Sequence, residues 1–259
     1  MTRRLSGDPS GGWAAPAPPP PEVVGGRQTL VEEVLIVLAL SLLASAVYSI
    51  IDLATAPISG VSVAVYPVAP FATQLAEVVF GLAPVYLVLH LARRSAEPID
   101  DFGLGTSRLG SDAAWGLLLA AIVATVGLGF YFGSVALHVN RFVNPAPPLH
   151  HWWTIPILIL GAIEAGLLEE VVVVGYLVTR LQQLAVAGGV AVCMSALLRG
   201  SYHLYQGWGG FAGNLALGLF FGAIFLRWRR TWPLVVAHAT IDTLAGLGYI
   251  LFHSHLPGG

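Results

Sequence analysis

Long apolar runs separated by short polar connections fill the sequence after residue 29. A run of about twenty predominantly apolar residues has the length that an α-helix needs to cross the hydrocarbon core of a bilayer. The pattern therefore predicts an all-α protein, a polytopic transmembrane bundle of about seven to eight helices. Seven segments carry the pattern: Leu30–Ile51, Pro70–Ala92, Ala113–Leu137, Trp153–Val178, Leu184–Tyr205, Phe211–Leu226 and Trp232–Phe252.

The first 29 residues have a different composition. Gly, Pro, Ser and Ala dominate them, and Pro18 to Pro21 form an unbroken run. Such a segment buries too little apolar surface to offset the entropy lost on ordering. We therefore expect a disordered cytoplasmic tail over residues 1–29 and a transmembrane helical domain over residues 30–259. No compact apolar core follows Arg3 and Arg4 within the tail, so we expect no cleaved signal peptide.

The overall composition is that of an integral membrane protein. Hydrophobic residues make up 56% of the 259 residues and charged residues only 10%, unlike an average soluble domain. All twelve basic residues are arginine and the formal net charge is −2. No basic surface therefore points to nucleic acid, and the lipid bilayer is the expected partner. The single cysteine, Cys193, excludes a disulfide framework and is expected to be buried.

The arginines fall into alternate connections between the predicted helices, which sets an orientation. Cytoplasmic loops carry an excess of basic residues, so this side should be cytoplasmic and the N-terminus inside. The acidic connection Ser95–Asp112 should then be a solvated cytoplasmic loop, and Arg141 is an exposed exception on the outer side. The arginines that define the cytoplasmic side are Arg27, Arg93, Arg94, Arg108, Arg180, Arg227, Arg229 and Arg230.

An acid pair, Glu169-Glu170, lies within an apolar segment. Ionisable groups in hydrocarbon are costly and usually face one another or a water-filled cavity, so the pair indicates a site. Adjacent helical positions are about 100° apart, so one carboxylate should face the cavity and the other a partner. Burial and a neighbouring anion can tune one glutamate to act as a general base. A proton-relay or helix-packing pair is the alternative.

Two histidines and an aspartate add to the candidate site. His238 and Asp242 are four residues apart, which places both on one helix face, where they could bind a metal, orient a water or stabilise an oxyanion. His203 follows Tyr202, which together with Tyr205 fits an interfacial aromatic belt. With straight helices, His203 would lie near the outer end of its segment and His238 near the inner end. A chain break at the glycines after His203, or a wrong segment boundary, would reconcile them.

The order of these motifs, a Glu pair, a His and a His-xxx-Asp on successive membrane segments, resembles the CPBP family of intramembrane proteases. This family includes the endopeptidases that trim prenylated CAAX proteins and bacterial members linked to bacteriocin maturation and self-immunity. The family's first motif is a Glu pair, three residues and an Arg, and its second is Phe-xxx-His. Here Val174 stands in place of the Arg and Arg199 in place of the Phe. The candidate motifs fall within residues 164–245.

The resemblance implies a role for each motif residue. Glu169 would activate the attacking water, His203 would hold that water, and Glu170 would orient and balance the site. His238 with Asp242 would stabilise the oxyanion, or His203, His238 and Asp242 could bind a metal such as Zn²⁺. The implied substrate is a peptide or protein within or at the membrane, and the implied family is a CAAX-type (metallo)endopeptidase.

The family's Arg is replaced by Val174, whereas an arginine, Arg199, stands where the family has Phe. Two interpretations of the positive charge of Arg199 follow. Arg199 shares a helical face with His203, so it could be the charge partner that replaces the family's Arg beside Glu170. Alternatively, it extends to the outer interface.

Two other functions fit the sequence. Because Val174 breaks the first motif, the chain could be an inactive relative that serves as a membrane scaffold or immunity factor. A proton-coupled transporter would also bury Glu, His and Asp, although no internal repeat is visible. The absence of lysine and the abundance of Ala, Gly, Val and Arg suggest a GC-rich gene, and hence a bacterial plasma membrane.

Overall fold

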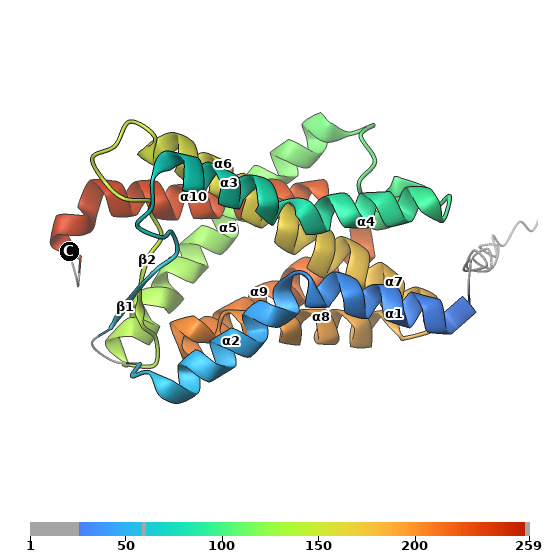
Figure 1. Ribbon diagram of the computed structural model, residues 1–259, viewed down its shortest axis with the longest axis horizontal. Helices are drawn as coiled ribbons and strands as arrows, with labels where there is room; N and C mark the ends of the chain where they lie inside the picture. Colours follow the sequence, from blue (N-terminus) through green and yellow to red (C-terminus); the bar gives the residue numbers. More distant parts are fainter. Residues whose placement is uncertain (1–25, 59–60, 257–259) are drawn as a thin grey trace, which may run out of the picture.

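The computed structural model describes residues 26–58 and 61–256. Within them the chain is mostly helical, with one short parallel strand pair (Figure 1). The helices are α1 (Gly26–Ala39), α2 (Leu42–Thr55), α3 (Phe71–Gly81), α4 (Ala83–Arg94), η1 (Ile99–Phe102), α5 (Leu109–Ala136), α6 (Thr154–Leu167), η2 (Leu168–Tyr176), α7 (Leu177–Gln183), α8 (Gly188–Tyr202), η3 (Leu204–Gln206), α9 (Trp208–Trp228), α10 (Trp232–Phe252) and η4 (His253–His255), and the strands are β1 (Ser62–Ala64) and β2 (Phe142–Asn144).

The predicted all-α bundle of about seven to eight helices is confirmed. Each of the seven predicted segments corresponds to one helical rod, because α1 with α2, α3 with α4, and α6 with η2 and α7 follow one another with little or no interruption. In the described residues, four helices are long and apolar enough to cross a membrane, or five if α1 and α2, which are bent by 53°, form one span. Together with the composition, these helices identify an integral membrane protein.

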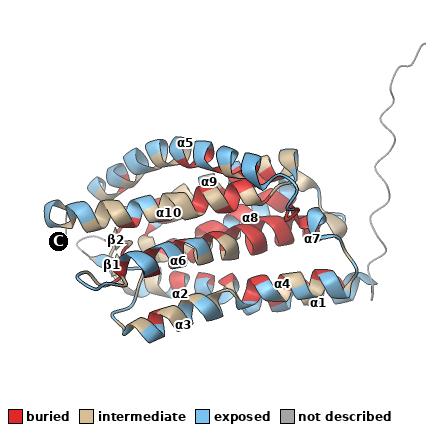
Figure 2. Cartoon of the chain, turned by 90° about the horizontal axis from the view of Figure 1, so that it is seen from above, coloured by how far each residue is buried: buried red, intermediate tan, exposed pale blue. Residues whose placement is uncertain are grey.

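Buried residues are distributed unevenly along the bundle. The main hydrophobic cluster lies between η2, α4, α9 and the beginning of α10, where Val172, Val174, Phe221 and Phe225 are fully buried. Figure 2 shows the buried residues concentrated in the part of the bundle nearer α7, whereas exposed and intermediate residues prevail toward β1, β2 and the end of α10. The densest packing of the bundle therefore lies toward the α7 end.

Small residues allow α8 and α9 to approach each other closely. A Cβ on Gly222 would lie 2.6 Å from Cγ1 of Val192, and one on Gly218 would lie 2.9 Å from the Cα of Ala196. The Gly218-xxx-Gly222 spacing is therefore a packing surface within the chain, as small residues at this spacing commonly are in membrane proteins.

Two arginines that we expected to be exposed are buried. Arg141, the supposed exposed exception, is 1% exposed and forms an ion pair with Asp52. Its guanidinium also donates to the backbone carbonyls of Ala56 and Tyr205, at 3.0 and 2.6 Å. Arg180, on α7, is likewise 1% exposed and pairs with Glu33 and Glu97. The prediction was wrong because hydropathy does not reveal buried ion pairs.

The acidic connection before α5 is only partly solvated. Phe102 and Leu104 are buried, and the Glu97 carboxylate binds Nη1 of Arg180 at 2.6 Å. The connection therefore folds back onto the bundle, contrary to the expectation of a fully solvated loop. Cys193 is exposed on α8, so the expectation of a buried thiol was also wrong.

The boundary of the N-terminal tail also differs from the predicted one. Helix α1 begins at Gly26, four residues before the predicted start of the helical domain. The rest of the predicted tail, residues 1–25, lies outside the described residues.

Candidate active site

The acid pair lies on a π-helix rather than on the expected α-helix. Segment η2 follows α6 directly and continues into α7, so the whole rod is unbroken. The hydroxyl of Ser195 donates to the carbonyl of Val173 at 2.6 Å, which anchors the segment to α8. A π-helix is rare and frequently marks a functional site. Its wider turn also alters which side chains share a face with Glu170.

Glu170 is the buried member of the pair. Its side chain is 0% exposed, and its Oε1 lies 2.7 Å from Nη2 of Arg199 and 2.7 Å from Nδ1 of His238. One carboxylate oxygen thus joins η2 to α8 and α10. A buried carboxylate is stable only with such partners, so Glu170 connects the three helices that carry the motifs.

Glu169 faces a less enclosed region. Its Oε2 accepts a hydrogen bond from the hydroxyl of Tyr202 at 2.8 Å and lies 3.2 Å from Nη2 of Arg199. Nε2 of His203 is 3.7 Å from the same oxygen, beyond hydrogen-bond distance, and has no hydrogen-bond partner among the described residues. The Glu169 side chain is 11% exposed and that of His203 16% exposed. The two carboxylates of the pair therefore have different surroundings.

His238 has a carboxylate at each ring nitrogen. Nδ1 faces Glu170, and Nε2 lies 3.3 Å from Oδ2 of Asp242, one helical turn away. The Asp242 side chain is 42% exposed, whereas that of His238 is 9% exposed. The ring is therefore held in one orientation between a buried and an accessible carboxylate.

The three residues that could have formed a metal site do not do so. Among the described residues, no group of three His, Cys, Asp or Glu side chains has the arrangement of a metal site. His203 binds the Gln206 side chain through Nδ1 at 3.1 Å, and both nitrogens of His238 face carboxylates. The set His203, His238 and Asp242 therefore does not fit a Zn²⁺ ion in this structure.

The helices bring the motifs together because they are staggered. A Cβ on Gly175 would lie 2.9 Å from Oγ1 of Thr231, the residue before α10, and one on Gly166 would lie 3.0 Å from the carbonyl of Val235. Helix α10 thus begins beside the end of η2 and runs antiparallel to it, which carries His238 to Glu170. The gap predicted between His203 and His238 for straight helices is not found, because His203 lies beside Glu169 and His238 beside Glu170.

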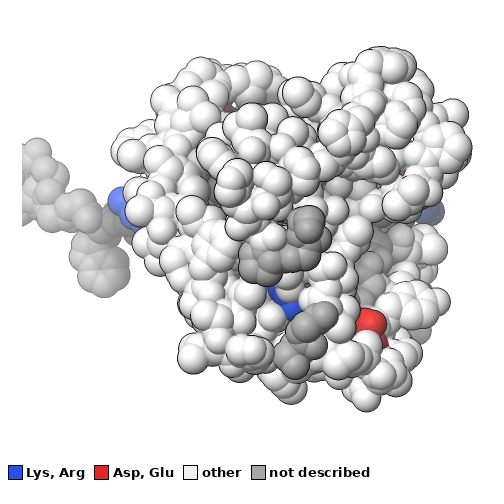
Figure 3. Space-filling model, turned by 90° about the vertical axis from the view of Figure 1, so that its left-hand side faces the viewer, with Lys and Arg blue, Asp and Glu red and all other residues white. Residues whose placement is uncertain are grey.

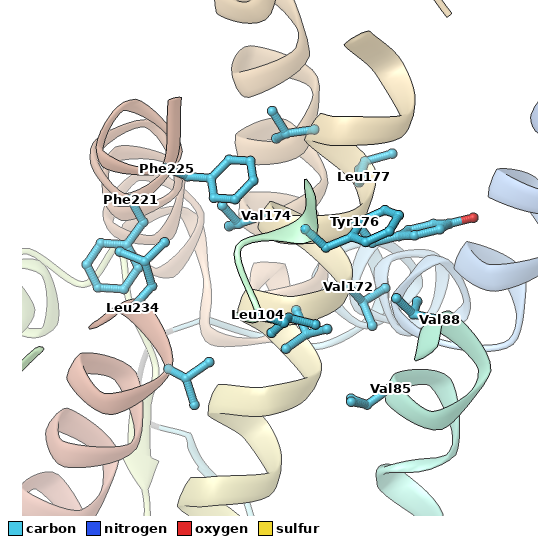
Figure 4. Close-up of a cluster of buried hydrophobic side chains, with 14 of the residues drawn as sticks. Val85, Val88, Leu104, Val172, Val174, Tyr176, Leu177, Phe221, Phe225 and Leu234 are labelled. Atoms are coloured by element: carbon cyan, nitrogen blue, oxygen red, sulfur yellow. The ribbon is translucent and has the colours of Figure 1, made fainter. Parts of the chain in front are cut away.

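Val174 and Arg199 occupy different surroundings. Figure 4 shows Val174 beside Phe221 and Phe225 in the hydrophobic cluster, where its exposed fraction is 0%. Arg199 is also 0% exposed, and its guanidinium lies over the Phe221 ring with 5.7 Å to the centroid. The side chain therefore does not extend to the membrane interface. A buried cation stands next to both carboxylates of the pair, contributed by α8 instead of by η2.

Tyr202 is a site residue that the sequence interpretation missed. It is 4% exposed, with its hydroxyl bound to Glu169, so it does not belong to an interfacial belt. Its position three residues after Arg199 in a helix is the signal that could have placed it on the same face.

The fold and the site define an integral membrane protein in which a buried acid pair, two histidines and an arginine converge from η2, α8 and α10. Residues 151–244, more than a third of the chain, match the family described as Rce1-like, type II CAAX prenyl endopeptidase Rce1-like. The chain therefore contains an Rce1-like domain, and the predicted resemblance to CAAX proteases is confirmed at the level of the family. This range includes every candidate catalytic residue. No curated protein and no solved structure gives a significant match to the chain.

Proposed function

We propose that the protein is an intramembrane endopeptidase that hydrolyses a peptide bond through a water activated by Glu169. The Rce1-like domain supports a protease of the CAAX type, and the surroundings of the acid pair support this division of roles. The substrate would be a peptide or protein within or at the membrane. The reaction would need no covalent intermediate, because a carboxylate base and an activated water suffice.

The single observation that carries the proposal is the spacing of Glu169 and His203. Their facing atoms are 3.7 Å apart, a distance that a shared water can bridge, and Nε2 of His203 is buried without a hydrogen-bond partner among the described residues, so a water there would satisfy it. A water held there would lose its proton to Glu169 and attack the scissile carbonyl carbon. Glu169 would then pass that proton to the amide nitrogen as the tetrahedral intermediate collapses, so that the C–N bond breaks and the amine leaves. Tyr202 and Arg199, both bound to the same carboxylate oxygen, would hold Glu169 in the required orientation.

The remaining groups would act on the developing charge. His238, oriented by Glu170 and Asp242, is the candidate donor to the oxyanion of the tetrahedral intermediate. Glu170 would have no direct contact with the substrate, because its side chain is fully buried. It would instead keep Arg199 and the His238 ring in place.

Orientation and location complete the proposal. Exposed arginines at the ends of α4 and α9, Arg93, Arg94 and Arg227, lie on the side where α1 begins and favour a cytoplasmic N-terminus by the positive-inside rule. Amino-acid usage favours a bacterial plasma membrane.

Cleavage of a peptide library by purified, detergent-solubilised protein tests the function. Activity should be lost with Glu169→Gln and with His238→Ala, in protein that still elutes as a folded species, and a chelator should leave it unchanged. An inactive scaffold or immunity factor would give no cleavage from the folded wild type. A proton-coupled transporter would instead lose solute uptake when Glu169 is changed.

A further inference from the structure

The turn that follows His203 supplies a partner to the ring nitrogen that faces away from Glu169. Helix η3 begins at Leu204, directly after His203, and ends at Gln206. The side-chain amide nitrogen of Gln206 lies 3.1 Å from Nδ1 of His203 and 3.0 Å from the hydroxyl of Tyr205. The two ring nitrogens of His203 therefore have different surroundings: Nδ1 faces an amide, and Nε2 faces Oε2 of Glu169 across 3.7 Å.

The amide of Gln206 is oriented by what lies on its other side. A Cβ on Gly210 would lie 3.0 Å from Oε1 of Gln206, so the amide oxygen borders the first turn of α9. The first N–H groups of a helix have no intrahelical partner and carry a partial positive charge, which favours an oxygen at this place. The amide nitrogen then faces Nδ1 of His203.

This arrangement selects one tautomer of His203. An amide nitrogen only donates hydrogen bonds, so Nδ1 of His203 accepts the bond from Gln206. In a neutral imidazole one ring nitrogen is a donor and the other an acceptor. The ring proton is then on Nε2, which faces Glu169 and has no hydrogen-bond partner among the described residues.

A buried arginine holds the turn that carries Gln206. Arg141 is 1% exposed, and its Nη1 donates to the carbonyl of Tyr205 at 2.6 Å. Its backbone N–H donates to the carbonyl of Gln206, also at 2.6 Å. Asn140 and Gly207 form an antiparallel bridge beside these bonds. The segment before β2 therefore fixes the backbone at Tyr205, Gln206 and Gly207.

The charge of Arg141 serves contacts inside the protein. Arg141 lies next to β2, at the end of the molecule that Figure 3 shows, where nearly all of the visible surface comes from uncharged residues. Its guanidinium forms an ion pair with Asp52 and donates to the carbonyls of Ala56 and Pro57 at 3.0 Å each. A buried cation is costly unless its N–H groups are bound, so these bonds keep it in one position. The turn after His203 is thus attached to a rigid group.

We propose that Gln206 is a positioning residue that holds His203 with its proton on Nε2, and that Arg141 fixes the turn from which it does so. A water between His203 and Glu169 would then accept a hydrogen bond from Nε2–H and donate one to the Glu169 carboxylate. The opposite tautomer would present a lone pair at Nε2, which would compete with Glu169 for the protons of that water. The tautomer is independent of catalysis, whereas its effect on a reacting water rests on the proposed function.

Nitrogen NMR of the full chain labelled with nitrogen-15 histidine tests the tautomer, because protonated and unprotonated ring nitrogens resonate far apart. The His203 signals are assigned by their loss in His203→Asn, and spectra are recorded in detergent at a pH well above the usual range of histidine. The wild type should carry its proton on Nε2. Gln206→Glu places a carboxylate, which only accepts, beside Nδ1, so the proton should move to Nδ1. Gln206→Met removes the donor and should give a mixture of tautomers.

Gln182→Glu is the matched control, because it makes the same change on α7, away from His203. It should leave the His203 signals unchanged. Because Gln206 is partly exposed, its variants should fold, as judged by elution in detergent. A wild-type His203 with its proton on Nδ1 would overturn the proposal. So would a proton that stays on Nε2 in Gln206→Glu or in Gln206→Met, because another group would then set the tautomer.

Arg141→Lys tests the attachment of the turn. Lysine keeps a positive charge beside Asp52 but cannot donate to the same set of carbonyls, so the second tautomer of His203 should appear in its spectrum. Arg180→Lys, the same change at an arginine that is also 1% exposed, should not alter the His203 signals. Equal spectra of the two lysine variants would overturn the role of Arg141.

Cleavage kinetics separates the tautomer from the proposed function. Gln206→Glu should lower kcat at least about tenfold and leave KM nearly unchanged, because only the reacting water is affected. A variant that cleaves at the wild-type rate with its proton on Nδ1 would overturn the link to catalysis. If the wild type cleaves nothing while the spectra change as expected, the proposed function fails and the role of Gln206 in setting the tautomer stands.

Discussion

Replacing Arg199 with leucine should destabilise the protein more than any other single change at the site. Arg199 and Glu170 are both 0% exposed, and Nη2 is 2.7 Å from Glu170 and 3.2 Å from Glu169. The Arg199→Leu variant leaves two neighbouring carboxylates without their cation. Removing one partner of a buried ion pair costs about 3–5 kcal/mol, and we expect a loss in that range.

A double variant shows whether the loss comes from the unpaired charge. Replacing both members of a buried pair with apolar side chains is often neutral, and here it would leave only Glu169, which is partly exposed and keeps its hydrogen bond from Tyr202. Arg199→Leu combined with Glu170→Leu should therefore recover at least about 2 kcal/mol of the stability lost in Arg199→Leu. The assay is denaturant unfolding of the detergent-solubilised protein, followed by circular dichroism of its helices.

Arg180→Leu is the matched control for this series. Arg180 is also buried and bound to two acids, Glu33 and Glu97, but it lies about 15 Å along the helix from Glu170. The control should lose comparable stability while its folded fraction keeps its activity, whereas Arg199→Leu should lose both. An Arg199→Leu variant as stable and active as the wild type would refute the reasoning, and so would a double variant less stable than the single one.

Two further changes test the supports of the site. Tyr202→Phe removes the 2.8 Å hydrogen bond to Glu169, so the free energy of unfolding should fall by about 1.5–3 kcal/mol. The cleavage rate should fall as well. Unchanged values of both would mean that the hydroxyl is dispensable. Gly222→Leu inserts a side chain where a Cβ would already lie 2.6 Å from Val192, so thermal unfolding should show a loss of about 1–3 kcal/mol. Gly127→Leu, where a Cβ would meet nothing within 4 Å, is its control, and equal losses would contradict the packing account.

The helical rods could be predicted from the sequence because burial in lipid requires long apolar runs. The seven runs correspond to the seven rods, and the Glu169-Glu170 pair and His238 were recognised as candidates from their cost in hydrocarbon. The spacing of His238 and Asp242 likewise predicted their contact, since residues four apart share a helix face.

The relative placement of the rods could not be predicted from the sequence. Apolar runs fix the length of each helix but not its stagger, so the contact between His238 and Glu170 was not apparent. The π-helix was missed because hydrophobic periodicity does not distinguish a local widening of a helix. Arg141 and Arg180 were expected to be solvated, because their partners come from distant parts of the chain.

The measurement that tests the central claim most directly compares the cleavage rates of Glu169→Gln and Glu164→Gln with that of the wild type. Both changes remove one carboxylate from the same rod, but only Glu169 faces His203. General-base catalysis contributes about 10²–10⁴-fold to a rate, so Glu169→Gln should lose at least about a hundredfold while Glu164→Gln keeps most of its activity. Equal rates for the two variants, or a folded Glu169→Gln protein that cleaves at the wild-type rate, would contradict the account.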